Sequence, residues 1–513
     1  MKKILVLDFG SQYSALIIKA YRKLNIYAEL IRYDTPIDKI KLQNVKGIIL
    51  SGGPLSVFDK NKNTLSCDVK SLQKIAPVFG ICYGMQLIAN QWGAKLSSET
   101  HREYGLNHIQ WSDPLIKTIP KKHKVWMSHG DSIIKLPPEL KVLAYSNKGK
   151  EKEIPVVIKS KNLLAVQYHP EVLNTEYGNE VLKYFAKDMC KIDDNWNPET
   201  RESEIINIIK NTVGKKEKVL CALSGGVDSS VLGYALNKSL SKDQVFYFFI
   251  DTGLLRKNEF SEVLQIYKKM GLNVLGVNYS DLFINNLKDV SDPETKRKII
   301  GKTFIKVFEK EASNFKGIEY LAQGTLYSDV IESSTKSSVS EVIKSHHNVG
   351  GLPKNLNFKL LEPFNKIFKD EVRQLGESLG IDKKILYRQP FPGPGLAIRI
   401  IGNITLEKIK ILQNCDDVFI KSLKEHGLYY KIWQAFCVLL PVQSVGVQGD
   451  SRTYKFVLAL RAVTSEDGMT ARSYHFDPEV LESISTKITN EVSEVSRVVY
   501  DVSNKPPSTI EWE

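Results

Sequence analysis

Residues 223–230, with the sequence Leu-Ser-Gly-Gly-Val-Asp-Ser-Ser, combine the groups that a diphosphate site needs. The apolar run 218–223 predicts a strand before this stretch, and apolar residues at helical spacing over 229–240 predict a helix after it. Glycines at such a turn free the backbone, so the first N–H groups of the helix can bind an anion. Asp228 would repel a phosphate unless a divalent cation lay between them, which predicts a Mg²⁺ ion. No Gly-Lys-Ser/Thr follows, so the stretch is not a Walker A loop.

The complete pattern resembles the signature of the N-type ATP pyrophosphatases, which cleave ATP between its α and β phosphates and hold the pyrophosphate. The alternative is a Gly-Gly turn capped by serines, which occurs in many βα units. The resemblance implies ATP as a co-substrate. The residues expected to bind ATP or pyrophosphate here are Ser224, Gly225, Gly226, Val227, Asp228, Ser229 and Ser230.

A second group of chemically competent residues begins at Cys82, which is flanked by glycines after the apolar run 76–81. A sharp strand-to-helix turn exposes a thiol there, and the helix N-terminus favours its thiolate. Taken alone, such a cysteine is more often a small buried hydrophobic residue than a nucleophile. The apolar run 163–168, however, leads into His169, and Glu171 follows two residues later. A nucleophile, a base and an orienting carboxylate are the set that thiol-dependent acyl transfer requires.

Residues 2–190 resemble the class I glutamine amidotransferases. The resemblance implies that the cysteine attacks the side-chain amide of glutamine, with the histidine as base and the glutamate as orienting acid. It also implies an oxyanion hole built from the N–H groups of Gly53, in the Ser-Gly-Gly-Pro turn 51–54, and of Tyr83. We interpret His129 as structural or close to an interface, because the other histidine has the better-placed acid.

Several charged residues follow other predicted strands. Asp251 ends a buried strand and could meet the ribose or purine of a nucleotide, or could simply cap the next helix. Asp329 and Glu332 lie three residues apart in a loop and could hold a metal ion or position a lid. The polar, glycine-ended stretch 343–351 predicts such a lid, which could bring Lys344 onto phosphates.

The pattern of strands and helices predicts an α/β protein with two doubly wound domains, followed by a smaller α+β domain. The Pro/Gly loop 388–399 joins the second part to the third. The tail 500–513 carries two prolines, an isoleucine and a tryptophan, so we expect it to dock rather than fray. The expected domains are 1–192 (amidotransferase), 193–388 (ATP pyrophosphatase) and 389–513 (dimerisation and nucleotide binding).

The length, composition and net charge of the chain limit the classes of protein to which it can belong. With 513 residues the chain is too long for a single core. It contains no apolar run of about 18 residues, so no membrane-spanning helix is expected. Six widely spaced cysteines without a Cys-x-x-Cys argue against zinc and disulfides and favour the cytoplasm. The net charge of +13 is spread along the chain beside acids, so we expect neither a nucleic-acid nor a membrane partner.

An ammonia-releasing domain joined to an adenylating domain predicts ATP-driven amination, and the whole chain resembles the glutamine-hydrolysing GMP synthetases. Besides the two catalytic signatures, the resemblance rests on the Pro-Phe-Pro-Gly-Pro-Gly-Leu loop 390–396 and on the terminal stretch 505–513. It implies that O2 of XMP attacks the α-phosphate of ATP, giving adenyl-XMP and pyrophosphate. Ammonia from glutamine then displaces AMP at C2 to leave GMP.

The same resemblance implies which residues bind the nucleotide. We also expect residues 389–513 to pair two chains into a homodimer, with the XMP site near that interface. The implied XMP-binding residues are Arg297, Gln448, Lys505, Ile510 and Glu511, and the expected metal ligands are Asp228, Asp329 and Glu332.

Other classes of protein fit the sequence less well. A tRNA-modifying pyrophosphatase would need an RNA-binding module or sulfur-relay cysteines, and neither is evident. A scaffold with a relic triad is disfavoured by the intact cysteine, histidine and glutamate. The glutamine-dependent NAD synthetases share the pyrophosphate loop but pair it with a different type of amidase.

Overall fold

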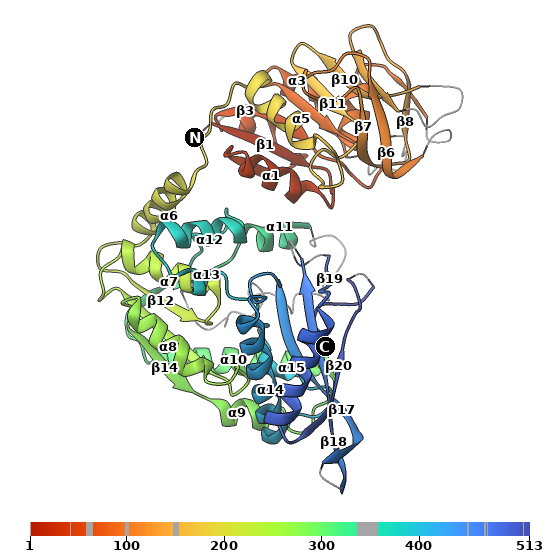
Figure 1. Ribbon diagram of the computed structural model, residues 1–513. Coiled ribbons are helices and arrows are strands. Elements are labelled where there is room, and N and C mark those ends of the chain that lie inside the picture. The colour runs from red at the N-terminus through yellow and green to blue at the C-terminus, as the bar shows by residue number, and fades with distance from the viewer. Residues whose placement is uncertain are drawn as a thin grey trace. The chain divides into compact units, whose positions relative to one another are not determined.

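The computed structural model describes residues 2–41, 43–57, 65–97, 102–146, 153–335, 358–448, 451–465, 468, 470–505 and 507–513; for 332–335, 448 and 451 only the backbone is described. The chain divides into two compact units, 1–201 and 202–513 (Figure 1). No helix within the described ranges is long and apolar enough to cross a membrane.

Unit 1 contains a nine-stranded sheet with the strand order β2-β1-β3-β4-β11-β10-β9-β6-β7. The first five strands in this order are parallel, and the remaining pairings are antiparallel. The strands β3, β4 and β11 are almost entirely buried, as expected for parallel strands covered on both faces. The elements are β1 (Lys3–Asp8), α1 (Ser14–Lys23), β2 (Ala28–Arg32), α2 (Ile37–Lys41), β3 (Val45–Leu50), α3 (Val69–Gln73), β4 (Val78–Ile81), α4 (Tyr83–Gln91), β5 (Lys95–Ser97), β6 (Glu103–Trp111), β7 (Lys122–His129), β8 (Ser132–Lys135), β9 (Lys141–Ser146), β10 (Ile154–Ser160), β11 (Leu163–Val166), α5 (Gly178–Tyr184) and the π-helix η1 (Phe185–Met189).

The strand order brings together the residues predicted for the glutamine site. Strand β4 lies between β3 and β11 and pairs with both in parallel, so the carboxyl ends of the three strands lie at one edge of the sheet. The turn 51–54 follows β3, Cys82 follows β4, and residues 167–171 follow β11. Three segments that are far apart in the sequence therefore meet at this edge.

Unit 2 contains a five-stranded parallel sheet with the order β14-β13-β12-β15-β16. The strand order reverses at β12, and such a switch point forms a ligand crevice outside the carboxyl ends of the strands. The loop 224–230 follows β12 at this point. The elements are α6 (Pro198–Thr212), β12 (Lys218–Leu223), α7 (Val227–Ser239), β13 (Val245–Asp251), α8 (Glu259–Lys269), β14 (Val274–Asn278), α9 (Ser280–Asn286), α10 (Pro293–Ser313), β15 (Ile318–Ala322), α11 (Tyr327–Thr335), β16 (Lys359–Leu361), α12 (Lys369–Ser378) and α13 (Lys383–Leu386).

The rest of unit 2 is an α+β assembly in which strands β17 to β20 form a four-stranded sheet. Its apolar core is continuous with that of the five-stranded sheet, because Leu220 and Phe248 belong to the same cluster as Leu412 and Leu458. The shared core explains why residues 202–513 form one compact unit. The elements are the 3₁₀ helix η3 (Gly395–Arg399), α14 (Leu406–Glu425), β17 (Gln434–Gln448), β18 (Ser451–Thr464), β19 (Arg472–Ser473), α15 (Pro478–Glu491) and β20 (Val495–Tyr500).

The predicted fold class is confirmed: two α/β sheets with parallel strands are followed by an α+β part. The lengths of the C-terminal strands were less accessible to prediction. Alternating segments predict strands at 444–448, 456–460 and 498–502; the first of these covers only the end of β17, which begins at Gln434. Residues 435–439 are all buried, so they lack the alternation of polar and apolar side chains that indicates a strand.

Candidate active sites

Cys82 occupies a strained turn between β4 and α4. Its backbone has φ 52° and ψ −105°, a left-handed conformation that is costly for any residue with a side chain. The two flanking glycines make the turn possible, because a Cβ atom on Gly80 would lie 2.5 Å from Ile88 and one on Gly84 would lie 2.4 Å from the carbonyl oxygen of Leu50. The geometry is that of a nucleophile elbow, which holds its side chain at the top of a sheet.

His169 and Glu171 form a buried pair at the end of β11. His169 Nδ1 lies 2.8 Å from Glu171 Oε1, and the two side chains are 4% and 0% exposed. Burial lowers the pKa of His169, but the charge of Glu171 and the contact with Cys82 outweigh it and raise that pKa well above its usual value. By contrast, burial raises the pKa of the Cys67 thiol to about 12, which keeps that cysteine inert.

The predicted oxyanion residues also lie at this edge. A Cβ atom on Gly53 would lie 3.4 Å from the ring of Tyr83, and one on Gly52 would lie 3.1 Å from His169 Cε1. The Tyr83 N–H is the first of helix α4. The structure thus brings together all five residues predicted for the glutamine site, and their individual roles stay predictions.

Other polar residues beside the cysteine were not predicted. Gln167 Nε2 donates to Cys82 Sγ at 3.7 Å, and Gln86 Nε2 contacts Gln167 Oε1 at 3.4 Å. His129 is buried and pairs with Glu103 on the neighbouring strand, not with Glu171. Gln167 and Gln86 stand in the two amidotransferase signatures, but only their burial beside the thiol distinguishes them.

In unit 2 the loop 224–230 is closed by its own hydroxyl groups. The backbone N–H of Ser224 donates to Ser229 Oγ at 3.2 Å, and Ser230 Oγ donates to the carbonyl oxygen of Gly226 at 2.7 Å. Gly225 has φ +74°, a backbone conformation that favours glycine. Helix α7 begins at Val227, so its first turn follows the two glycines directly. A diphosphate would meet the positive end of this helix.

Asp228 lies in the first turn of α7, and among the described residues only one of its two carboxylate oxygens lies near a positively charged side chain. Its Oδ2 atom is 3.5 Å from Lys369 Nζ, whereas its Oδ1 atom is buried without a hydrogen-bond partner in the described part of the chain. Gly324, after β15, lies beside Asp228, because a Cβ atom added to it would be 3.6 Å away, in ordinary van der Waals contact. Arg388 donates to the carbonyl oxygen of Gly225 at 3.3 Å. The sequence assigns no role to Lys369 or Arg388, because neither belongs to the signature.

Of the remaining residues predicted to bind ATP or a metal ion, the structure describes the side chains of some but not of others. Asp251 Oδ1 accepts from the N–H of Gly253 at 2.8 Å, and helix α8 is capped at Asn258 instead. Asp329 and Glu332 were predicted in a loop, which is wrong, because both belong to helix α11. Asp329 Oδ2 accepts from the N–H of Leu326 at 2.9 Å, at the start of this helix. Only the backbone of Glu332 is described, and Lys344, with the expected lid 343–351, lies outside the described residues. Their roles in binding ATP or a metal stay predictions.

The C-terminal tail is held by three fully buried cations. Arg399 donates to Glu511 through Nε at 3.1 Å and Nη2 at 2.8 Å, a bidentate contact. Lys296 pairs with Glu513, and Arg461 donates to main-chain oxygens of the tail. Each of the three cations is 0% exposed. The tail therefore docks as predicted, mainly through charge-assisted hydrogen bonds.

Four of the five residues predicted to bind XMP lie in or beside this docked tail. Arg297 donates to the main-chain oxygen of Glu513, Lys505 Nζ donates to Gly468, and Ile510 is buried. The side chain of Gln448 lies outside the described residues. Glu511, which pairs with Arg399, lines a pocket of about 530 Å³ beside the tail.

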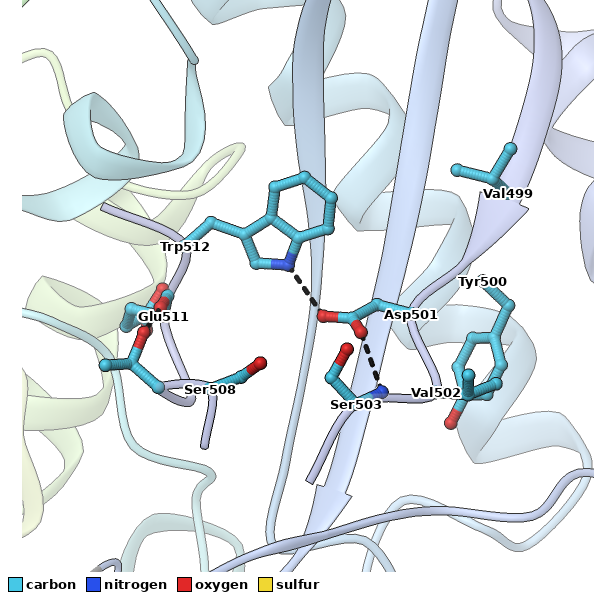
Figure 2. Close-up of a pocket in the computed structure, with 9 residues that line it drawn as sticks. Val499, Tyr500, Asp501, Val502, Ser503, Ser508, Glu511 and Trp512 are labelled. Atoms are coloured by element: carbon cyan, nitrogen blue, oxygen red, sulfur yellow. Dashed lines mark hydrogen bonds between the residues drawn. The ribbon is translucent and has the colours of Figure 1, made fainter. Parts of the chain in front are cut away.

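Figure 2 shows this pocket between the end of β20 and the tail. Trp512 Nε1 donates to Asp501 Oδ2 at 2.9 Å across it, and the N–H of Ser503 donates to Asp501 Oδ1 at 2.9 Å. Carboxylates and hydroxyls line it, so a neutral polar group with N–H or O–H donors would suit it better than a phosphate.

Three family models match the chain in separate segments. The model for glutamine amidotransferase class-I matches residues 5–189, the model for NAD synthase matches 202–302, and the model for the GMP synthase C terminal domain matches 421–512. The fold and the two sites thus define an amidotransferase joined to a nucleotide-binding enzyme.

Similarity to whole proteins identifies the family. A protein of Bdellovibrio bacteriovorus is 51% identical and one of Campylobacter lari is 50% identical, each over all of both chains. A protein of Bacillus subtilis is 48% identical over 99% of this chain and 98% of its own length. All three are named GMP synthase (glutamine-hydrolyzing). This chain belongs to the glutamine-hydrolysing GMP synthase family of enzymes.

The buried Glu171 sets the charge of His169, so Glu171→Gln should shift the pH dependence of glutamine hydrolysis. Without the carboxylate, only the contact with Cys82 opposes the effect of burial, so the pKa of His169 should fall. The alkaline limb of the kcat/KM profile for glutamate release should therefore move to lower pH, and kcat/KM should fall at least about tenfold. Glu180→Gln, on the exposed start of α5, is the control and should leave the profile unchanged. An unmoved alkaline limb in the first variant would contradict the assignment.

Proposed function

We propose that this chain converts XMP to GMP by ATP-dependent amination, through an adenyl-XMP intermediate and with ammonia taken from glutamine. The products would be GMP, AMP, pyrophosphate and glutamate. The proposal rests on two sites that occur in one chain. In the first, Cys82 occupies a nucleophile elbow beside a buried His–Glu pair. In the second, the loop 224–230 lies at the switch point of a parallel sheet, where it can bind a diphosphate. Ammonia release and adenylation are the two half-reactions that such sites support.

In the first half-reaction, the Cys82 thiolate attacks the side-chain carbonyl carbon of glutamine. The oxyanion that forms would accept hydrogen bonds from the N–H groups of Gly53 and Tyr83, whose position at the same edge supports this role. The raised pKa of His169 keeps a proton available, and the imidazolium gives it to the departing ammonia. Water then attacks the thioester, His169 takes the water proton, and glutamate leaves.

In the second half-reaction, the loop 224–230 would hold the β and γ phosphates while O2 of XMP attacks the α-phosphate and pyrophosphate leaves. Lys344, Asp251, Asp329 and Glu332 keep their predicted roles here. Ammonia then attacks C2 of adenyl-XMP and AMP departs, since AMP is a far better leaving group than the original carbonyl oxygen.

The residues present fit a Mg²⁺ ion at Asp228, because its Oδ1 atom is buried without a partner in the described part of the chain. The described ranges contain no group of three His, Cys, Asp or Glu residues that could hold a metal by themselves. Asp228 would therefore share the ion with the phosphates of ATP. When bound, Mg²⁺ supplies positive charge between this carboxylate and the phosphate oxygens.

XMP would bind beside the docked tail, through Arg297, Gln448, Lys505, Ile510 and Glu511. Two observations support this site. Arg297, Lys505 and Glu511 all lie in the tail or contact it. Glu511 also lines a pocket whose carboxylates and hydroxyls can accept hydrogen bonds. Arg297 and Lys505 supply the positive charge that a nucleotide phosphate needs. Domain boundaries at residues 192 and 388 remain part of this proposal.

We also propose that two chains pair through the C-terminal sheet. One part of that sheet leaves several apolar side chains exposed, and Val445 is paired with Tyr454 across the strands β17 and β18. Exposed apolar surfaces of this kind mark interaction sites. The exposed residues are Val442, Val445, Val447, Tyr454 and Val499. The cytoplasmic location predicted from the cysteines stays a prediction.

Replacement of the nucleophile should separate the two half-reactions. Cys82→Ala should abolish GMP formation from glutamine but spare GMP formation from free ammonia at raised pH, because only amide cleavage needs the thiolate. The measurement is GMP produced from XMP and ATP with each nitrogen source. Cys67→Ala, a half-buried cysteine of the same unit, is the matched control and should keep both activities. Loss of both activities in a folded Cys82 variant would contradict the proposal.

Replacement of the loop carboxylate should block adenylation whichever nitrogen source is used. Asp228→Asn removes a charge-assisted contact, which costs about 1.5–3 kcal/mol and lowers the rate about ten- to hundredfold. The measurement is the XMP-dependent exchange of labelled pyrophosphate into ATP. Asp281→Asn alters the second residue of helix α9, as Asp228 is the second residue of α7, and should exchange normally. Normal exchange in the Asp228 variant would remove the phosphate role.

Replacement of the acid that binds Arg399 should weaken XMP binding. Glu511→Gln leaves a buried guanidinium without its charge partner, a loss of about 3 kcal/mol in the stability of unit 2. The KM for XMP should rise at least tenfold with either nitrogen source, and thermal unfolding should occur at lower temperature. Glu479→Gln, exposed on α15, should change neither value. An unchanged KM for XMP would show that the docked tail is not part of the site.

A further inference from the structure

A chain of buried hydrogen bonds ends at the sulfur of Cys82 and is not used by the triad. It links side chains from four different segments of unit 1. Four of its links are shorter than 3.5 Å between nitrogen and oxygen, and the last joins an amide nitrogen to sulfur at 3.7 Å. The five side chains are between 1% and 4% exposed. In order they are Glu103, His129, Gln86 (reached through the carbonyl oxygen of Asp131), Gln167 and Cys82.

The carbonyl oxygen of Asp131 determines the orientation of both glutamine amides. This oxygen can only accept, so the atom of Gln86 that lies 3.0 Å from it must be the NH₂ nitrogen. The same NH₂ group contacts Gln167 at 3.4 Å, so the oxygen of Gln167 must face it. The NH₂ group of Gln167 is therefore directed at Cys82 Sγ.

The far end of the chain is held by a second His–Glu pair. His129 Nδ1 lies 2.9 Å from the carbonyl oxygen of Asp131, so it carries a proton and donates it to that oxygen. Its Nε2 lies 3.2 Å from Glu103, and a proton must lie between these two atoms for the contact to be attractive. Glu103 also accepts from Asn107 at 2.9 Å and from Ser146 at 2.6 Å, which fixes the position of its carboxyl group.

Two neighbours of the sulfur act in opposite directions. The carbonyl oxygen of Ser128 lies 3.5 Å from Sγ and accepts from the thiol, so it favours the protonated form. An amide N–H directed at Sγ favours the thiolate, since a hydrogen bond to the charged form stabilises it. Gln167 therefore offsets the effect of Ser128 at the reacting atom.

We propose that Gln167 is a catalytic residue of the glutamine site: its amide N–H donates to the sulfur of Cys82 and stabilises the thiolate, both before attack and when sulfur leaves the thioester. Gln86, His129 and Glu103 are positioning residues that hold the amide in this orientation. The proposal rests on the proposed glutamine hydrolysis at Cys82.

Alkylation tests the proposal without turnover, because iodoacetamide reacts with the thiolate. The full chain is alkylated over a range of pH, and the label on Cys82 is quantified by mass spectrometry. Gln167→Glu replaces the donor by a carboxylate oxygen, and Gln167→Met removes the donor at similar size without adding charge. Gln91→Glu is the matched control, because the Gln91 amide bridges backbone groups of Cys67 and Val69 outside the chain of bonds.

The pH midpoint of Cys82 alkylation should rise by about one unit or more in Gln167→Glu and by a smaller amount in Gln167→Met. It should not move in Gln91→Glu. An unchanged midpoint in Gln167→Met, which keeps the size of the side chain, would overturn the proposal even if the charged variant fails to fold. Glutamate release by the unmutated chain is measured alongside; its absence would refute the proposed function, whereas its presence with unshifted midpoints would refute only the role of Gln167.

Discussion

The parallel pairing of β4 with β3 and β11 is the constraint on which the glutamine site depends. Parallel strands end at the same edge of a sheet, so a cysteine after one and a histidine after the next must meet however far apart they lie in the sequence. The same constraint acts in unit 2, where the loop 224–230 follows β12 and Gly324 follows its neighbour β15. One topological rule thus builds both candidate sites, and the side chains add only the chemistry.

The parts of the molecule that could be predicted are those specified by local pattern. The Gly-Gly loop, the cysteine flanked by glycines and the His-x-Glu stretch each lie within a few residues, and each sits on an element whose apolar spacing is visible. Gly84 shows why such patterns are reliable. No larger residue fits against the carbonyl oxygen of Leu50, so a glycine at this position indicates that the two backbone segments lie close together. The predicted fold class is confirmed for the same reason.

The parts that could not be predicted depend on contacts between distant segments. The pair His169–Glu171 is visible in the sequence because only Pro170 lies between its members. The pair His129–Glu103 is equally buried, but it forms across β6 and β7, and only the register of these strands places the two residues opposite each other. Gln167 likewise lies in a recognised stretch, yet its contact with the sulfur follows from Gln86 on another element.

The net charge of +13 illustrates the same limit, because it does not distinguish solvated cations from buried ones. Lys296, Arg399 and Arg461 are each fully buried, and each binds the tail. An unpaired buried charge is costly, so the tail is held in place by the cost of leaving these cations without partners. Trp512, the largest apolar side chain of the tail, remains 39% exposed and contributes less. Four of the five residues predicted to bind XMP lie in or contact the same tail, so under the proposed function nucleotide binding and the folding of unit 2 would depend on one set of ion pairs.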